Sequence, residues 1–182
     1  MARTIKVKLS SKDINNLVFR LDNFSNALDS AISNSIKDLA EMAENSMRNT
    51  YNSRPQASTQ IDFKTTGSDY SKTISMFGNQ AAYEEFGTGT MGEENPHPKK
   101  SSFELNEYNS GRTIRPASKR VEEAQGIPEG ELYWTYVDEN GELHYTQGVS
   151  AGKEAYNAAK VVRKQIKPVV EKYLKGALKW FP

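Results

Sequence analysis

The sequence has no cysteine and only two histidines, His97 and His144. Without cysteine the chain can form no disulfide, no thiolate metal site and no thiol nucleophile, a composition typical of a protein assembled in a reducing cytoplasm. His97 stands between two prolines and His144 falls within a predicted hairpin, so we expect neither to be a metal ligand or a base. The sequence also contains none of the common nucleotide-binding, hydrolase or metalloprotease motifs. We therefore expect no metal, no cofactor and no enzymatic activity.

Long apolar runs are missing as well. No stretch approaches the 18 apolar residues of a membrane-spanning helix, and the first ten residues, MARTIKVKLS, lack a hydrophobic signal core, so we expect no membrane partner. The formal net charge is only +1, which by itself indicates no nucleic-acid partner. Hydrophobic residues make up only 36% of the chain, a low share for a self-sufficient globule. This predicts that neighbouring subunits supply part of the stability.

Two features near residue 87 resemble reactive sites without meeting their requirements. Glu84 and Glu85 are adjacent, so they point to opposite faces of a strand or about 100° apart on a helix and cannot share a proton. The run GTGTMG at 87–92 is similar to a phosphate-binding glycine loop, but its third glycine comes one residue early. Pro96 and Pro98 stand where a helix should begin and hold the phosphate. We expect neither catalysis nor nucleotide binding here.

The first half of the chain alternates between strand and helix patterns. Residues 4–9 alternate as TIKVKL, which predicts an edge strand. From Ile14 to Met47 apolar residues recur every three or four positions, which predicts one long amphipathic helix or two in sequence, beginning at Ser11 and breaking at Asp22–Asn23. The alternating runs 58–65 and 71–77 predict a hairpin.

The second half adds another hairpin and another long helix. Leu132 to Val137 and Glu142 to Thr146 flank Asn140-Gly141, a strong hairpin turn signal. A second long helix is expected from Ser150 onward, with Pro168 kinking or dividing it near Ile166. Residues 87–130 are rich in glycine and proline, and only 117–125 could form a short helix. We interpret 87–130 as an excursion ordered mainly by neighbouring subunits; a merely solvated loop is the alternative.

These patterns predict an α+β protein with a single domain over residues 1–182. Its core, residues 1–86 and 131–182, would hold a mostly antiparallel sheet of four to five strands with two long helices packed on it. Residues 87–130 would form the long irregular excursion from that core.

Positive charge is concentrated in the predicted C-terminal helix. This segment contains only two acidic residues, Glu154 and Glu171. Its eight basic residues are Lys153, Lys160, Arg163, Lys164, Lys167, Lys172, Lys175 and Lys179. The segment from Glu84 to Glu142 is rich in glutamate. This helix face is solvated, meets an acidic surface of another subunit, or contacts DNA. The candidate interface or DNA-facing residues are Lys160, Arg163, Lys164 and Lys167. Trp180 and Phe181 form an apolar tail that either packs on the core or meets a partner.

The stretch AAYEEFGTG resembles the "YA-x-x-EFGTG" signature of a tail-component family of long-tailed bacteriophages. This family is named after the tenth gene product of a lambdoid coliphage. The matching residues are Ala82, Tyr83, Glu85, Phe86, Gly87, Thr88 and Gly89. Gly152, Tyr156 and Ala159 are similar to the family's second motif at the start of the C-terminal helix, although Ala155 replaces the usual proline.

The resemblance implies a non-enzymatic structural protein of the virion, assembled in the cytoplasm of a bacterial host and located at the head–tail junction. Copies of the chain would form a homo-oligomeric ring, with six copies expected, that serves tail completion. The ring would join the capsid connector or stopper to the tail terminator or tail tube, with DNA passing through it. The signature residues would be structural or at an interface. The alternative function is a DNA-binding accessory protein that uses the basic C-terminal helix.

Overall fold

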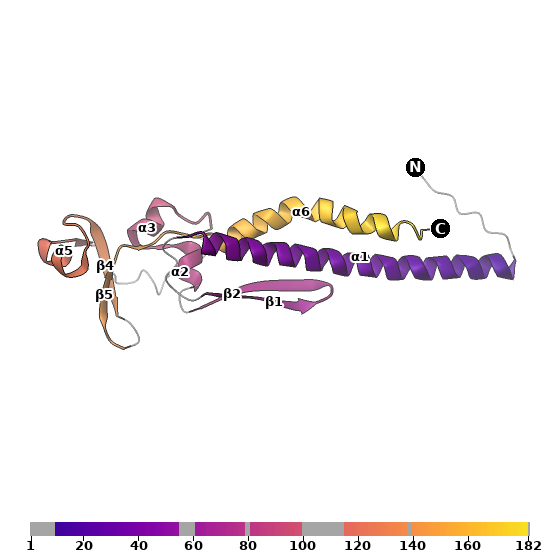
Figure 1. The fold of residues 1–182 in the computed structure, drawn as a ribbon, viewed down its shortest axis with the longest axis horizontal. Coiled ribbons are helices and arrows are strands. Elements are labelled where there is room, and N and C mark those ends of the chain that lie inside the picture. Colours follow the sequence, from indigo (N-terminus) through magenta and orange to yellow (C-terminus); the bar gives the residue numbers. More distant parts are fainter. Residues whose placement is uncertain (1–9, 55–60, 79–80, 100–114, 138–139, 182) are drawn as a thin grey trace. The chain divides into compact units, whose positions relative to one another are not determined.

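The computed structural model in Figure 1 describes residues 10–54, 61–78, 81–99, 115–137 and 140–181. The predicted strand at 4–9 lies outside these residues. The chain divides into two compact units. Unit 1 comprises residues 1–46, 63–75 and 158–182, and unit 2 comprises residues 47–62 and 76–157. Each is described in turn.

Helix α1, Ser11–Asn52, supplies the longest element of unit 1. The Ser10 hydroxyl oxygen accepts a hydrogen bond from the Asp13 backbone N–H at 3.2 Å, so Ser10 caps the helix where the sequence predicts its start. Of the two predicted alternatives, one long helix is confirmed and the break at Asp22–Asn23 is wrong, because α1 continues through both residues. The Asn23 side-chain amide donates to the Phe19 carbonyl one turn earlier, at 2.8 Å. Its polar group is thereby satisfied on the helix surface without interrupting the backbone.

The predicted hairpin of unit 1 is confirmed. Strands β1 (Asp62–Ser68) and β2 (Ser71–Phe77) form a two-stranded antiparallel sheet. Phe63 is buried, and the Thr65 hydroxyl donates to the Glu44 carboxylate of α1 at 2.5 Å. The hairpin is therefore attached to α1 by the contact between Thr65 and Glu44, and it buries Phe63.

Helix α6, Glu154–Ala177, is the second predicted long helix, and its residues from Ala158 onward belong to unit 1. Pro168 lies inside it and does not divide it, so of the two predicted alternatives the division is wrong and the kink stays a prediction. A proline removes one backbone hydrogen bond of the helix. The helix continues because Val169 and Ala177, beyond the proline, are buried as Ala158 is before it.

Two contacts join α6 and its C-terminal tail to α1 within unit 1. The Asp38 carboxylate accepts hydrogen bonds from the Tyr173 hydroxyl at 2.7 Å and from the Lys172 ammonium at 3.0 Å. Beyond the helix end, Phe181 packs edge-on against Phe24, with ring centroids 5.1 Å apart. Phe181 therefore packs on its own chain.

Unit 2 is built around a three-stranded antiparallel sheet in the order β3-β4-β5. The strands are β3 (Arg115–Pro116), β4 (Leu132–Val137) and β5 (Leu143–Thr146), and β4 and β5 form the second predicted hairpin, with Trp134 opposite Thr146. The other elements are the last turn of α1, helices α2 (Ala81–Phe86), α3 (Gly89–Glu94) and α5 (Lys119–Gln125), the short strand β6 (Gly148–Val149) and the first turn of α6.

The predicted α+β class is thus confirmed, with two long helices and antiparallel strands. The strands divide between two sheets rather than joining in one. The short helix expected at 117–125 appears as α5. Residues at the start of the expected excursion are packed into unit 2, where Thr88 and His97 are each only 5% exposed. The single-domain organisation stays a prediction.

We expect Tyr173→Phe to weaken unit 1 in a pH-dependent way. Hydrogen bonds from Tyr173 first and Lys172 second lower the pKa of Asp38. A lowered carboxyl pKa gives stability that is present above the unfolded pKa of about 3.9 and is lost as the pH falls through the lower folded pKa. Loss of the hydroxyl should cost about 1 kcal/mol of unfolding free energy at pH 7, and less in acid.

The measurements are denaturant unfolding at pH 7 and pH 3 and an NMR titration of Asp38, whose pKa should rise in the variant. The control is Tyr70→Phe, because Tyr70 is 61% exposed and its stability should not change. An unchanged Asp38 pKa in Tyr173→Phe would contradict the assignment.

Candidate functional site

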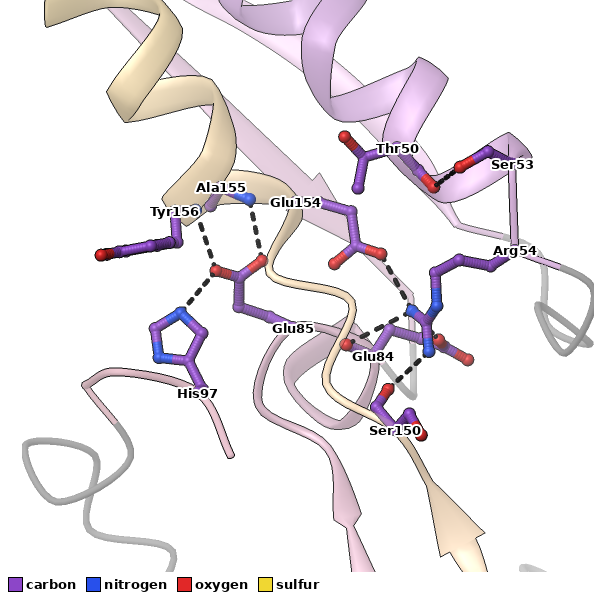
Figure 2. Close-up of polar contacts among 10 residues, drawn as sticks. All are labelled: Thr50, Ser53, Arg54, Glu84, Glu85, His97, Ser150, Glu154, Ala155 and Tyr156. Carbon is purple, nitrogen blue, oxygen red and sulfur yellow. Dashed lines mark hydrogen bonds and ion pairs between the residues drawn. The ribbon is translucent and has the colours of Figure 1, made fainter. Parts of the chain in front are cut away.

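The two adjacent glutamates of helix α2 are both buried. Glu84 is 1% exposed and Glu85 is 7% exposed. A buried carboxylate is costly unless charges or hydrogen bonds compensate it. Figure 2 shows that the two side chains diverge from α2 toward different partners, as neighbouring positions on a helix require.

Arg54 compensates Glu84. It follows the end of α1 by two residues, and its Nη1 atom lies 2.6 Å from Oε2 of Glu84 and 2.9 Å from Oε1 of Glu154. Its Nη2 atom donates to the Ser150 carbonyl at 2.6 Å. The planar guanidinium presents several donors in fixed directions, so one side chain can hold three acceptors (Figure 2). Arg54 therefore joins the end of α1 to α2 and to the start of α6 inside unit 2.

Glu154 is the most deeply buried carboxyl of this cluster, with an exposed fraction of 0%. Its Oε2 atom has no hydrogen-bond partner among the residues that the structure describes. Burial raises the pKa of Glu154, Arg54 acts in the opposite direction, and Glu85 raises it further. Because the folded pKa lies above the unfolded one, this group lowers stability as the pH rises from about 4.3 through the folded pKa.

Glu85 caps the N-terminus of helix α6. Its Oε2 atom accepts the backbone N–H of Ala155 at 2.8 Å, and its Oε1 atom accepts that of Tyr156 at 3.0 Å. The first N–H groups of a helix have no partner within the helix, and a negative charge there is favourable. In return, the backbone N–H groups of Gly152 and Lys153 donate to the carbonyls of Glu84 and Glu85 at 2.7 and 3.2 Å. The C-terminal end of α2 and the start of α6 thus satisfy each other.

His97 completes the environment of Glu85. Its Nδ1 atom accepts the backbone N–H of Lys99 at 3.0 Å, so this nitrogen carries no proton. The proton is therefore on Nε2, which donates to Oε1 of Glu85 at 3.1 Å. The edges of Phe86 and Tyr156 flank the ring, with centroids 4.5 and 5.3 Å away. Both ring nitrogens are occupied, which favours a structural role over catalysis.

The glycines after α2 let the chain approach the segment before α6. Gly87 has φ 73°, and a Cβ atom there would lie 2.6 Å from the Ala151 nitrogen. At Gly89, φ 60°, a Cβ would lie 2.5 Å from the Gln147 carbonyl oxygen. Between them the Thr88 hydroxyl accepts the Val149 N–H at 3.1 Å. Any side chain at these two glycines would separate the two segments.

A third glycine, Gly152, lies directly beside the ion pair of Arg54 and Glu154. A Cβ at Gly152 would lie 1.9 Å from Oε1 of Glu154 and 2.2 Å from Nη1 of Arg54. With a side chain at this position, Glu154 and Arg54 would have to shift from the positions in which they pair.

The structure brings most of the predicted signature residues to one place. Those that meet around α2 and the start of α6 are Glu85, Phe86, Gly87, Thr88, Gly89, Gly152 and Tyr156. Ala82 is exposed and Tyr83 is half-buried. The sequence analysis missed Arg54, His97 and Glu154 as members of this cluster. No local pattern marks them, since each is defined by a partner far along the chain.

The predicted surface residues do not belong to unit 2, which holds this cluster. Lys160, Arg163, Lys164 and Lys167 are exposed on the part of α6 that belongs to unit 1. Trp180 is 49% exposed.

The contacts of this cluster connect the end of α1, helix α2 and the start of α6. Glu84 and Glu154 share Arg54, whereas Glu85 points toward the start of α6 and His97 (Figure 2). In the described part of the chain, no three histidine, aspartate or glutamate side chains are grouped so as to hold a metal ion. Over the same residues, no helix is long and apolar enough to cross a membrane.

Comparison with known proteins gives no relative: no family model, curated protein or solved structure matches this chain.

We expect Gly87→Ala to be much more destabilising than Gly126→Ala. Both glycines have a positive φ, 73° and 71°, so both variants bear a similar backbone cost of about 1–2 kcal/mol. Nothing lies within 4 Å of a Cβ at Gly126, whereas at Gly87 it meets the backbone of Ala151. Overpacking should add about 1–3 kcal/mol for Gly87→Ala, as measured by chemical unfolding. Equal losses in the two variants would show that the close approach is not needed.

Arg54→Met should be strongly destabilising, by about 3–5 kcal/mol of unfolding free energy, because it leaves buried carboxyl groups without a cation. Adding Glu84→Gln and Glu154→Gln to the same chain should recover at least half of that loss. Arg163→Met is the control, since Arg163 is exposed and its replacement should change stability by less than about 0.5 kcal/mol. Thermal and urea unfolding of the variants test this, and a triple variant no more stable than Arg54→Met would refute it.

Proposed function

We propose that this chain is a structural protein of a tailed bacteriophage virion. In this proposal it forms a homo-oligomeric ring of six copies at the head–tail junction, where it completes the tail and joins the capsid connector to the tail tube. It would be assembled in the cytoplasm of the bacterial host, act without a cofactor and carry out no catalysis. Its partners would be other copies of itself, the neighbouring proteins of the neck, and the DNA that passes through the ring.

One contact carries the proposal. The two stretches that resemble the phage tail-component family lie about 70 residues apart in sequence, and Glu85 of the first accepts the backbone N–H of Tyr156 of the second. The glycines of both stretches are the positions where close approach is required. The residues that carry the resemblance therefore contact one another in the folded chain. This supports the proposal that the signature determines the fold.

The chemistry of the cluster agrees with a structural role. Its polar side chains are engaged with one another and with backbone groups, and both ring nitrogens of His97 are hydrogen-bonded within the chain. A protein whose most buried polar residues position helices is suited to hold a shape within an assembly.

A DNA-binding accessory protein is the second candidate. The observation that favours it is the exposed basic set of α6, Lys160, Arg163, Lys164 and Lys167. Strong, sequence-independent DNA affinity that falls steeply with salt concentration would support this alternative.

The test of the main proposal is genetic and structural. Phage that lack this chain should accumulate filled heads and separate tails, and cryo-electron microscopy of complete particles should locate the chain as a ring at the neck. Complete, infectious particles formed without the chain, or particles from which it is absent, would overturn the proposal. A Gly126→Ala chain, with its predicted mild effect on folding, should restore joining and serves as the control.

A further inference from the structure

Charge is divided unevenly between the two units. Counted over the whole sequence, unit 1 holds fifteen basic and eight acidic residues, a formal charge of +7. Unit 2 holds nine basic and fifteen acidic residues, a formal charge of −6. The net charge of +1 conceals this division, because the two units nearly cancel.

Buried residues do not account for the whole negative charge of unit 2. Three of its acidic residues, Glu84, Glu85 and Glu154, are buried beside Arg54. Setting these four aside leaves twelve acidic and eight basic residues, a formal charge of −4. In the described part of this unit, Glu122 and Glu123 of α5 and Glu129 just beyond it are exposed. Lys119 and Arg120, also exposed, begin the same helix, so the acidic surface lies toward its end and the following turn.

In unit 1 the positive charge forms a continuous face. Lys160, Arg163, Lys164 and Lys167 are spaced by three and four residues, which places them on one side of α6. All four are exposed, and the opposite side of the helix holds the buried Ala158 and Val169. Only one acidic residue, Glu171, lies on this side, where it pairs loosely with Lys167 at 3.9 Å. Neither Arg163 nor Lys164 has an acidic residue of α6 at a spacing of three or four.

A second copy of the chain fits this face better than DNA does. Every copy carries a negative unit that would be repelled by phosphate, and the chain as a whole has almost no net positive charge to attract a polyanion. Unit 2 is opposite in sign to the basic face of α6. Its formal charge of −6 is similar in magnitude to the +7 of unit 1, to which that face belongs. When two different patches of one chain are complementary, copies associate head to tail and can close into a ring.

We propose that the basic face of α6 in one copy binds the acidic surface formed by Glu122, Glu123 and Glu129 in the next copy. This rests on the proposed function, since it names the surfaces through which the subunits of the ring meet. The contact orients the subunits and speeds their encounter, while apolar side chains supply most of the affinity.

Charge reversal tests the pairing. One variant carries Arg163→Glu, Lys164→Glu and Lys167→Glu, and the other carries Glu122→Lys, Glu123→Lys and Glu129→Lys. Sedimentation velocity of the full-length chain in 50 mM salt should show concentration-dependent association of the wild type. For each variant alone the dissociation constant should rise at least about tenfold, because three attractive pairs become repulsive. An equimolar mixture of the two variants should associate again, since each then offers the charge that the other needs.

Zero-length carbodiimide cross-linking of mixed light and isotope-labelled protein provides the second readout, because it joins only lysines and carboxylates in contact. Cross-links from Lys164 to Glu122 or Glu123 between differently labelled copies are expected. Cross-links within one copy only, association unchanged by charge reversal, or an exclusively monomeric chain at 50 mM salt would overturn the inference. So would DNA binding that the α6 variant loses while its self-association is intact. Imaging of the particles tests separately whether the chain lies at the neck. If only the association and cross-linking experiments fail, this pairing of surfaces is wrong while the proposed function stands.

Discussion

Unit 2 depends on the way one guanidinium and one helix end neutralise three buried carboxyl groups. Arg54 holds Glu84 and Glu154, and the first turn of α6, together with His97, holds Glu85. A single buried carboxylate without such partners would cost several kcal/mol. The contacts therefore have to form together, and together they fix where α1 ends, where α2 lies and where α6 begins.

This arrangement explains why glycine recurs around the cluster. Hydrogen bonds between the α2 end and the segment before α6 require the two backbones to approach closely, and a Cβ at Gly87 or Gly89 would hold them apart. Burial also raises the pKa of Glu154, so the cluster contains one carboxyl that is easier to protonate than usual. The buried carboxylates reach Arg54 and the start of α6 only when the two backbone segments approach closely, so the charge pairing and the close approach depend on each other.

Because of this constraint, the buried and the exposed residues have different roles. Buried residues such as Glu85 and His97 are fully occupied in holding the fold and have little capacity left for a partner. Exposed residues such as Lys164 and Glu122 contribute little to the fold and are free to set how copies meet. In a ring-forming protein the first group would determine the shape of the subunit, and the second would determine its orientation in the assembly.

Local pattern was sufficient for most elements. The spacing of apolar residues predicted both long helices and both hairpins, and β2 and β4 have the predicted bounds, because these elements are determined by neighbours within a few positions. Local pattern left alternatives open where a weak local signal competes with packing: α1 is one continuous helix through Asn23, and Pro168 does not divide α6.

By itself, the sequence determined the periodic elements and the divergence of Glu84 and Glu85. Only the tertiary structure decided which groups neutralise those glutamates. Glu84 meets Arg54 from 30 positions earlier, and Glu85 meets His97 from 12 positions later and Tyr156 from 71 positions later. Such pairings leave no periodic trace, because they depend on how the folded chain brings distant backbone segments into contact.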